Sequence, residues 1–389
     1  MPRFPSIAPL AHTLSAGVFG PAKTGTPSSP KAFPLHVGDT YLEPLPAARA
    51  EAQRSEGHPE LHRYAPNQGE PALLQAILDK VARRSGVQLD QECVQVMAGA
   101  TAAMNVLCTT LLAPGDEVII PAPFWPLIRG AVQARGATAV EVPIMTRLDD
   151  EGFDPVQEIE RALTPRTCAI YVNTPHNPTG HAMPESLLQG IAALATTHNL
   201  WIIADEAYED VWFGPQPPAS VFARADMAGR VITTHSVSKS YALGGARIGY
   251  THGPHEVMQA IRGVQTFYSY CAARPMQWAA TAALNGGDTW QRDMRERYRR
   301  AAHAAAAALS VPMPAGGTFL FVDAQPFMRK EDSLSTLLGR CLDAGVMLTP
   351  GTACGATFDT WLRLCFTSVP ESTLHEALQR LHEVLFEKP

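Results

Sequence analysis

The stretch Val231-Ile-Thr-Thr-His-Ser-Val-Ser-Lys-Ser-Tyr-Ala-Leu-Gly-Gly-Ala-Arg-Ile-Gly-Tyr-Thr251 joins two short apolar runs through a polar loop. The runs at 231–234 and 248–251 are rich in β-branched residues, which is typical of strands. Between them, Lys239 lies among three serines, and Arg247 follows eight residues later. An exposed lysine needs no such neighbours, whereas a catalytic amine needs its charge suppressed and an anion site nearby. The hydroxyls and Arg247 are candidates for that anion site.

Five further apolar runs precede this stretch and alternate with longer helical patterns. This alternation predicts an α/β fold whose large domain has a mostly parallel seven-stranded sheet with helices on both faces. In such sheets, ligands bind beyond the carboxyl ends of the strands, where loops and helix N-termini meet. Polar residues directly after each run are therefore the candidates for function. The five runs are 94–97, 117–120, 139–142, 168–172 and 201–204.

The pattern changes after residue 288 and predicts a smaller α+β domain. We expect a large domain over residues 39–288, with residues 1–38 and 289–389 forming an N-terminal arm and the small domain. The first 35 or so residues are rich in Pro, Ser and Gly, which is typical of an irregular arm. The predicted elements of the small domain are helices at 292–308, 334–344 and from about 371 onward, and strands at 318–322, 346–348 and 362–366.

Composition indicates a soluble globular enzyme. Of the 389 residues, 17% are charged and 46% hydrophobic, and the net charge is -6, so neither a nucleic-acid partner nor a membrane surface is expected. Seven scattered cysteines lack metal-ligand spacing, which argues against a disulfide framework and a metal site and favours a cytoplasmic protein. We expect no signal peptide and no membrane anchor, because no long apolar run occurs.

Two polar or aromatic signals follow the first two runs. Gly99-Ala-Thr101 follows the first run and opens a helical pattern, so its N–H groups and the Thr101 hydroxyl are suited to an anion. A glycine turn with a threonine cap is the plainer interpretation. Phe124-Trp125 follows the second run, and its indole can stack on a flat ring, although large aromatics are usually core residues.

Two further signals follow later runs. Asn173-Thr-Pro-His-Asn-Pro-Thr-Gly180 contains several turn-forming residues that would hold the Asn177 amide rigidly, although such a loop can also be simple chain punctuation. Asp205 ends the run 201–204, and Tyr208 lies three residues on. A carboxylate there is costly to desolvate unless it meets a cation, and a helix N-cap is the alternative interpretation.

Together these signals predict a pyridoxal 5'-phosphate site. The cofactor requires an amine for its aldehyde, a carboxylate for its pyridinium nitrogen, an aromatic surface for its ring and an anion site for its phosphate. Lys239, Asp205, Trp125 and the group formed by the helix N-terminus, the hydroxyls and Arg247 supply a candidate for each.

The sequence resembles the fold-type I pyridoxal-phosphate enzymes, and specifically the class I and II aminotransferases, from about Leu35 to the C-terminus. Asn177-Pro-Thr-Gly180 and Ser236-x-Ser-Lys239 carry the resemblance most strongly. It implies that Lys239 forms the Schiff base with the cofactor and acts as general base. It also implies that Asp205 pairs with the pyridinium nitrogen, and that Tyr208 is a third catalytic residue.

The resemblance also implies the other cofactor contacts. Asn177 and Tyr208 would bond the 3'-oxygen, and Trp125 would stack on the ring. Tyr64, within Tyr64-Ala-Pro-Asn-Gln-Gly69, is similar to the tyrosine that the family lends to the phosphate of the other subunit, which implies a homodimer with shared active sites. The residues that resemble the phosphate cup are Ala100, Thr101, Ser236, Ser238 and Arg247.

For the substrate, Arg363 resembles the arginine that binds the α-carboxylate, with Gly38 and Asn177 nearby. No second arginine matches the one that would select a dicarboxylic side chain; Arg274 is expected at a helix start and on the surface. The predicted reaction therefore moves the amino group of a neutral or aromatic L-amino acid to a 2-oxo acid. The aromatic residues that hint at such a pocket are Tyr41, Trp125, Phe267 and Tyr268.

Three other functions compete with this prediction. A β-eliminating C–S lyase or a related enzyme of the same fold would use the same lysine and cofactor, and the sequence separates these poorly. A regulator with an aminotransferase-like domain would need a DNA-binding module, and no helix-turn-helix pattern or basic patch is present. A dinucleotide-dependent dehydrogenase would carry G-x-G-x-x-G after its first strand, where this chain has Gly-Ala-Thr.

Overall fold

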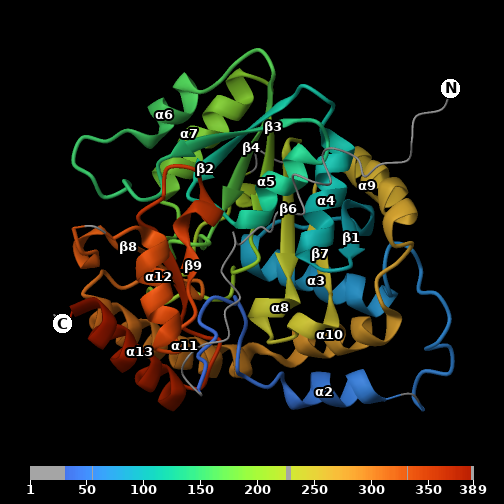
Figure 1. The fold of residues 1–389 in the computed structure, drawn as a ribbon. Coiled ribbons are helices and arrows are strands. Elements are labelled where there is room, and N and C mark those ends of the chain that lie inside the picture. Colours follow the sequence, from blue (N-terminus) through green and yellow to red (C-terminus); the bar gives the residue numbers. More distant parts are fainter. Residues whose placement is uncertain (1–30, 55, 225–228, 331, 387–389) are drawn as a thin grey trace, which may run out of the picture.

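The computed structural model describes residues 31–54, 56–224, 229–330 and 332–386. The larger part of the molecule is built on a seven-stranded sheet with the strand order β1-β7-β6-β5-β4-β2-β3 (Figure 1). Only β7 runs antiparallel to its neighbours, so the sheet is mostly parallel, as predicted. The strands are β1 Val94–Met97, β2 Glu117–Ala122, β3 Thr138–Pro143, β4 Thr167–Asn173, β5 Trp201–Asp205, β6 Val231–Ser236 and β7 Gly249–His252.

Helices cover both faces of this sheet because successive side chains of a strand point to opposite faces. In β2, Ile119 packs in one apolar cluster, whereas Val118 and Ile120 pack in another. The first cluster includes residues of α3 Pro71–Ser85, α7 Glu185–Thr197 and α10 Arg274–Gly286. The second includes residues of α4 Ala100–Leu111, α5 Pro126–Gln133 and α9 His255–Tyr268. The central strands are therefore buried on both faces, and their apolar runs are continuous.

The C-terminal part contains a second, antiparallel sheet with the order β8-β10-β9. Its strands are β8 Phe319–Asp323, β9 Thr349–Pro350 and β10 Trp361–Cys365, and a separate apolar cluster forms its core. In Figure 1 these orange and red elements gather at the lower left of the view. The helices of this part are α11 Asp288–Leu309, α12 Leu334–Asp343 and α13 Glu371–Phe386.

The strand predicted at 346–348 is wrong in position. Val346 makes only an isolated bridge with Phe33, and the strand itself is Thr349–Pro350. Phe33, far away in the sequence, takes the backbone position beside Val346. Residues 1–30 of the predicted N-terminal arm lie outside the described residues, and the domain boundary at residue 288, which is the first residue of α11, stays a prediction.

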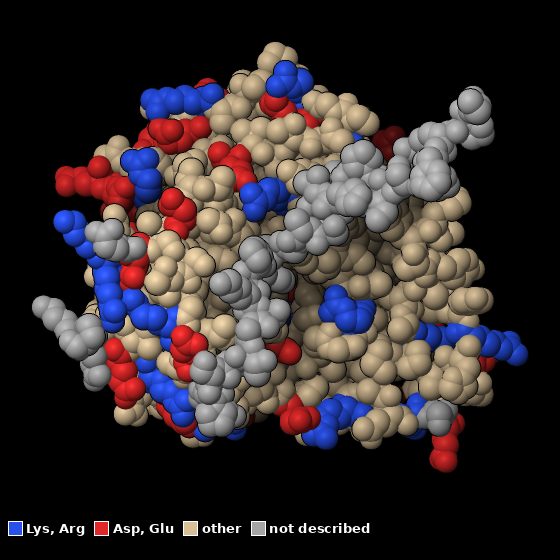
Figure 2. Space-filling model, viewed as in Figure 1, with Lys and Arg blue, Asp and Glu red and all other residues tan. Residues whose placement is uncertain are grey.

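The surface carries mixed charges. Figure 2 shows acidic and basic side chains interspersed on the face in view. The cysteines form no disulfide bonds: all seven are free thiols, and four of them are buried. In the described part of the chain, no helix combines the length and the apolar character needed to cross a membrane. Two further short helices are α2 Pro46–Gln53 and α6 Pro155–Arg161.

Candidate active site

A cavity of about 360 Å³ lies at the carboxyl end of the large sheet. Loops and helix N-termini that follow β1, β2, β4, β5 and β6 contribute to its wall, together with β8 and β10 of the small sheet. Every predicted site residue except Tyr64 lines it. These residues are Gly38, Ala100, Thr101, Trp125, Asn177, Asp205, Tyr208, Ser236, Ser238, Lys239, Arg247 and Arg363.

Lys239 lies on α8 (Val237–Ser240), the short helix that begins directly after β6. Its ammonium donates a hydrogen bond to the Gly38 carbonyl, and no carboxylate of the described residues pairs with it. Burial lowers the pKa of Lys239, while Cys365 and Asp39 partly oppose this shift. A lysine with a lowered pKa yields its neutral amine more readily, which is the form that acts as nucleophile or base.

Two arginines reach the cavity without a carboxylate partner among the described residues. Arg247 adopts a left-handed backbone conformation and donates from Nη1 to the Gly244 carbonyl at 2.8 Å. Arg363, on β10, is 3% exposed and lies over the Phe319 ring at 4.3 Å. Arg363 is buried without a counter-charge in the described part of the chain, which is costly unless an anion binds there, whereas Arg247 is exposed and presents its guanidinium to a ligand from the cavity wall. The cavity is therefore suited to a ligand with two anionic groups.

The Arg247 side of the cavity has the features of a phosphate site. Gly99, at φ 83, is the N-cap of α4, and a β-carbon there would collide with Nη2 of Arg247. The backbone conformation therefore favours glycine, and a larger residue would also displace the Arg247 guanidinium from this position. Ser236 caps α8 by accepting from the Ser238 amide at 3.1 Å. Helix N-termini and hydroxyls around a guanidinium favour a bound phosphate.

Asp205 ends β5 and is 5% exposed. Its Oδ1 accepts from the Ala207 amide at 3.1 Å, and its Oδ2 accepts from the Tyr171 hydroxyl at 2.8 Å. Burial raises the pKa of Asp205, although these two hydrogen bonds and His235 oppose the shift. No lysine or arginine among the described residues forms an ion pair with Asp205. A cationic group of a ligand would therefore supply the missing counter-charge of this carboxylate. Sequence reasoning missed Tyr171.

Asn177 links the centre of the cavity to its substrate side. Its amide nitrogen Nδ2 donates to the Tyr208 hydroxyl at 3.3 Å, and its Oδ1 accepts from Nη1 of Arg363 at 3.1 Å. The backbone amide of Asn177 donates to Oδ1 of Asn173 at 2.7 Å, which fixes the loop. Arg363 also donates from Nη2 to the His36 carbonyl at 3.3 Å. The loop and the small sheet therefore position one another.

Of the aromatic residues that the sequence placed near the site, only some line the cavity. Trp125 lines the cavity as the N-cap of α5. Tyr64 is 81% exposed and meets Tyr270 edge-on at 5.1 Å, so it does not line the cavity of its own chain. Phe267 and Tyr268 are exposed on α9 and do not line the cavity either. The hint of a pocket formed by them within one chain is not supported by this placement, and Tyr41 is also absent from the lining.

Arg274 is the first residue of α10, as predicted, but it is not a free surface residue. Its Nε pairs with the buried carboxylate of Glu70 at 2.7 Å, and its Nη1 donates to the Glu60 carbonyl at 2.7 Å. The prediction of a surface arginine is thus corrected: Arg274 is largely buried and serves as the partner of a buried acid.

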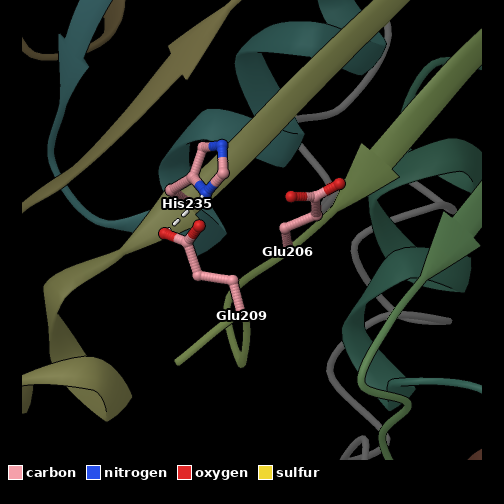
Figure 3. A group of neighbouring side chains, drawn as sticks. All are labelled: Glu206, Glu209 and His235. Atoms are coloured by element: carbon pink, nitrogen blue, oxygen red, sulfur yellow. Dashed lines mark ion pairs between the residues drawn. The ribbon is translucent and has the colours of Figure 1, made fainter. Parts of the chain in front are cut away.

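A second group of ionisable side chains lies close by but outside the cavity. Glu206 and Glu209 follow β5, and they point toward His235 on β6 (Figure 3). His235 Nδ1 is 2.9 Å from Oε1 of Glu209, and the Lys80 ammonium is also 2.9 Å from that oxygen. Lys80 additionally contacts Asp210 at 2.5 Å. Cations of the protein itself therefore already face these carboxylates.

The arrangement defines a class of protein. The cavity offers an amine, a buried carboxylate without a cation, an aromatic wall and a guanidinium group, which fit the aldehyde, ring nitrogen, ring face and phosphate of pyridoxal 5'-phosphate. A second arginine is left for a substrate carboxylate. On a mostly parallel sheet of seven strands, these features define a fold-type I pyridoxal-phosphate enzyme.

Comparisons with known proteins give the family. The model of the family "Aminotransferase class I and II" matches residues 30–381. The chain therefore belongs to this family, is an aminotransferase, and uses pyridoxal 5'-phosphate as its cofactor.

Similar proteins include aminotransferases with different substrates in their names. A probable aspartate/prephenate aminotransferase of Thermus aquaticus is 33% identical over 83% of this chain and 84% of its own length. The arginine–pyruvate transaminase of Pseudomonas aeruginosa is 34% identical over 82% of this chain and 81% of its own. The solved structure of N-succinyldiaminopimelate aminotransferase from Mycobacterium tuberculosis has a TM-score of 0.89 and 29% identity, and covers 97% of this chain and 100% of its own.

Proposed function

We propose that this aminotransferase moves the amino group of a neutral or aromatic L-amino acid to a 2-oxo acid, with Lys239 as the residue that holds the cofactor covalently and moves the proton. The observation that carries the proposal is the position of Lys239: a half-buried amine with a lowered pKa, on the cavity wall and without a carboxylate partner among the described residues. The bound cofactor supplies an electron sink for the bonds at the substrate α-carbon.

The residues proposed to hold the cofactor lie around Lys239. Asp205 would pair with the ring nitrogen, Trp125 would cover the ring, and Asn177 and Tyr208 would bond the 3'-oxygen. The 3.3 Å hydrogen bond between Asn177 and Tyr208 supports this pairing, because it brings both polar groups to one point of the wall. The proposed phosphate site consists of Ala100, Thr101, Ser236, Ser238 and Arg247.

Lys239 is suited to proton transfer once its amine is free. Burial favours the neutral amine, so the side chain can accept a proton from the substrate α-carbon and later donate it on the same side of the reacting group. Its hydrogen bond to the Gly38 carbonyl supports an orientation toward the substrate side, because Gly38 also lines the cavity.

Arg363 is proposed to bind the substrate α-carboxylate. A guanidinium can donate two parallel hydrogen bonds to a carboxylate, which an ammonium cannot reproduce. The Arg363 Nε is buried without a hydrogen-bond partner, and Asn177 and the His36 carbonyl hold the two terminal nitrogens. Because Nη2 also donates to the Thr349 hydroxyl, three of the five N–H donors are used, and Nε and the second N–H of Nη1 remain for a ligand.

The neutral or aromatic donor is proposed from the charges of the cavity. The arginines that line it are Arg247 and Arg363, and the proposal assigns these to the phosphate and the α-carboxylate. Arg274 is engaged by Glu70. Apolar side chains that lie on the wall, Val37, Leu127 and Phe319, favour an uncharged substrate side chain. One relative is named an aromatic-amino-acid aminotransferase, from Thermococcus litoralis, at 30% identity.

A panel of amino donors tests this proposal. We expect the highest kcat/KM for neutral or aromatic donors with 2-oxoglutarate or pyruvate as acceptor. A preference for aspartate or glutamate by more than tenfold would contradict the proposed side-chain class. Release of ammonia and pyruvate from cysteine-type substrates without amino transfer would instead favour the β-eliminating alternative.

We also propose a homodimer in which Tyr64 reaches the phosphate site of the partner subunit. Tyr64 is 81% exposed, and Phe267, Tyr268 and Tyr270 are exposed as well. Exposed large aromatics that gather on one monomer indicate a protein contact. Sedimentation of the cofactor-bound enzyme would show a dimer, and Tyr64→Phe would weaken cofactor binding. An active monomer would contradict the proposal.

A further inference from the structure

Tyr171 lies beside the cavity without lining it. It is 1% exposed on β4, where it pairs with Ile203 of β5, and Asp205 follows two residues further along β5. Since side chains alternate along a strand, Ile203 and Asp205 face the same side, and the Tyr171 hydroxyl reaches Oδ2 of Asp205 at 2.8 Å. We propose that Tyr171 is a positioning residue that orients the Asp205 carboxylate and keeps it ionised. This inference rests on the proposed role of Asp205.

The geometry gives each carboxylate oxygen one donor from a different element. The Ala207 amide, just after β5, bonds Oδ1, and the Tyr171 hydroxyl on β4 bonds Oδ2. A carboxylate held at both oxygens cannot rotate freely about its terminal bond. Asp205 itself lines the cavity, so the carboxylate is presented to a ligand in a fixed orientation. Precise placement of a charged group is a requirement of catalytic sites.

The electrostatics support a role for the hydroxyl rather than for the ring alone. The titratable groups that face Asp205 are Tyr171 from β4, Tyr208 after β5 and His235 from β6. Burial raises the pKa of Asp205, and the hydrogen bond from Tyr171 is the largest effect that opposes this shift. Burial also raises the pKa of Tyr171 well above its usual value, so the phenol stays a donor at every working pH.

A buried aromatic packing role is the competing explanation. Tyr171 belongs to the apolar cluster on one face of the sheet, where phenylalanine would fill nearly the same space. A hydroxyl buried there is costly without an acceptor, and Asp205 is the acceptor that the structure shows. Tyr171→Phe therefore separates the hydroxyl from the ring.

A double-mutant cycle tests the inference on the full chain, stripped of cofactor and titrated with pyridoxal 5'-phosphate from pH 5 to 9. The variants are Tyr171→Phe, Asp205→Asn and the pair. We expect Tyr171→Phe to weaken cofactor binding about tenfold, as expected for loss of a hydrogen bond to a charged group. The acid loss of binding should move to higher pH, because the pKa of Asp205 rises without its donor. In the Asp205→Asn background, removing the hydroxyl should change nothing further.

Tyr298→Phe is the matched control, because Tyr298 is equally buried and loses a hydroxyl that bonds Thr40. An equal effect of Tyr171→Phe with and without the Asp205→Asn substitution would overturn the inference, and so would unchanged affinity and pH profile. If Asp205→Asn alone leaves cofactor binding unchanged, the proposed role of Asp205 fails first. Infrared spectra of the cofactor-free protein give a second readout: the ionised carboxylate band that Asp205→Asn removes should be lost at higher pH in Tyr171→Phe.

Discussion

Two lysines of this molecule, the buried Lys80 and the half-buried Lys239, have opposite environments. Lys80, on α3, contacts the carboxylates of Glu209 and Asp210, and they outweigh burial and raise the pKa of Lys80 well above its usual value. Lys239 has no such partner among the described residues, and burial lowers its pKa. The first lysine is paired within the protein and supports the fold. The second is left without a counter-charge on a cavity wall, where a ligand can react with it.

The carboxylates of Glu209 and Asp205 differ in the same way, since only the first has cationic partners among the described residues. Interaction with His235 and Lys80 overcomes burial and holds the pKa of Glu209 well below its usual value, whereas burial raises the pKa of Asp205. Both acids lie in one short segment after or at the end of β5. Local sequence therefore does not distinguish a structural charge from a functional one; the partner supplied by the fold does.

The largest expected effect is on catalysis. Lys239→Ala should lower amino transfer by about 10⁴-fold or more, because it removes both the covalent attachment and the proton carrier. The free energy of unfolding of the cofactor-free protein should change little. Steady-state assays and urea unfolding measure the two. An amino-transfer rate of Lys239→Ala above one tenth of the wild-type rate would contradict the functional role that distinguishes Lys239 from Lys80.

Lys80→Met should have the reverse pattern. Removing the ammonium takes the Lys80 ion pair from Asp210 and leaves Glu209 with His235 and Arg84, so the free energy of unfolding should fall by about 3–5 kcal/mol. Arg63→Ala is the control, since its ion pair with Glu60 is solvent-exposed and should contribute about 1 kcal/mol or less. Equal effects of the two substitutions in urea unfolding would show that the buried pair does not stabilise the fold.

Arg363→Lys tests the unpaired cation on the substrate side. The ammonium cannot donate two parallel hydrogen bonds, so KM for the amino donor should rise about tenfold or more, with a smaller change in kcat. Cofactor affinity should stay the same, because the proposed phosphate contact is Arg247. An unchanged KM would remove Arg363 from the carboxylate site.

The smallest expected effect is the pH dependence of stability in the cofactor-free protein. The raised pKa of Lys80 stabilises the fold fully below pH about 10.5, the unfolded value, and this contribution is lost as the pH rises through the folded pKa. The lowered pKa of Lys239 destabilises the fold below its folded value, and this cost disappears as the pH rises toward about 10.5.

Substitution by methionine separates these two contributions. Lys239→Met should therefore stabilise the protein by about 0.5–2 kcal/mol at pH 7, and less at alkaline pH. The destabilisation by Lys80→Met should stay constant up to pH about 10.5, because the contribution of Lys80 is lost only above that value. Thermal unfolding from pH 7 to 10.5 measures both trends. A loss of stability in Lys239→Met at pH 7 would contradict the assigned environment.

Much of this architecture could be predicted from the sequence. Apolar runs that are buried on both faces read directly as strands of a parallel sheet, and residues at their carboxyl ends converge on one cavity whatever the details of packing. Lys239, Asp205 and Asn177 were therefore predictable from their positions after β6, β5 and β4.

The residues that were missed depend on contacts between distant segments. Tyr171 lies inside an apolar run and reads as a core aromatic, because only the register of β4 against β5 brings its hydroxyl to Asp205. Arg274 was predicted to lie on the surface because nothing in the local sequence shows that Glu70 faces it. The short strand at 349–350 was misplaced because its register against β10, Leu362 with Pro350 and Arg363 with Thr349, is a contact between distant segments.

Borohydride reduction of the cofactor-loaded enzyme, followed by peptide mass spectrometry, tests the central claim most directly. The account predicts one stable adduct, on the peptide that contains Lys239, and an unmodified Lys80. An adduct on another lysine, or protein that binds the cofactor without any reducible linkage, would contradict it.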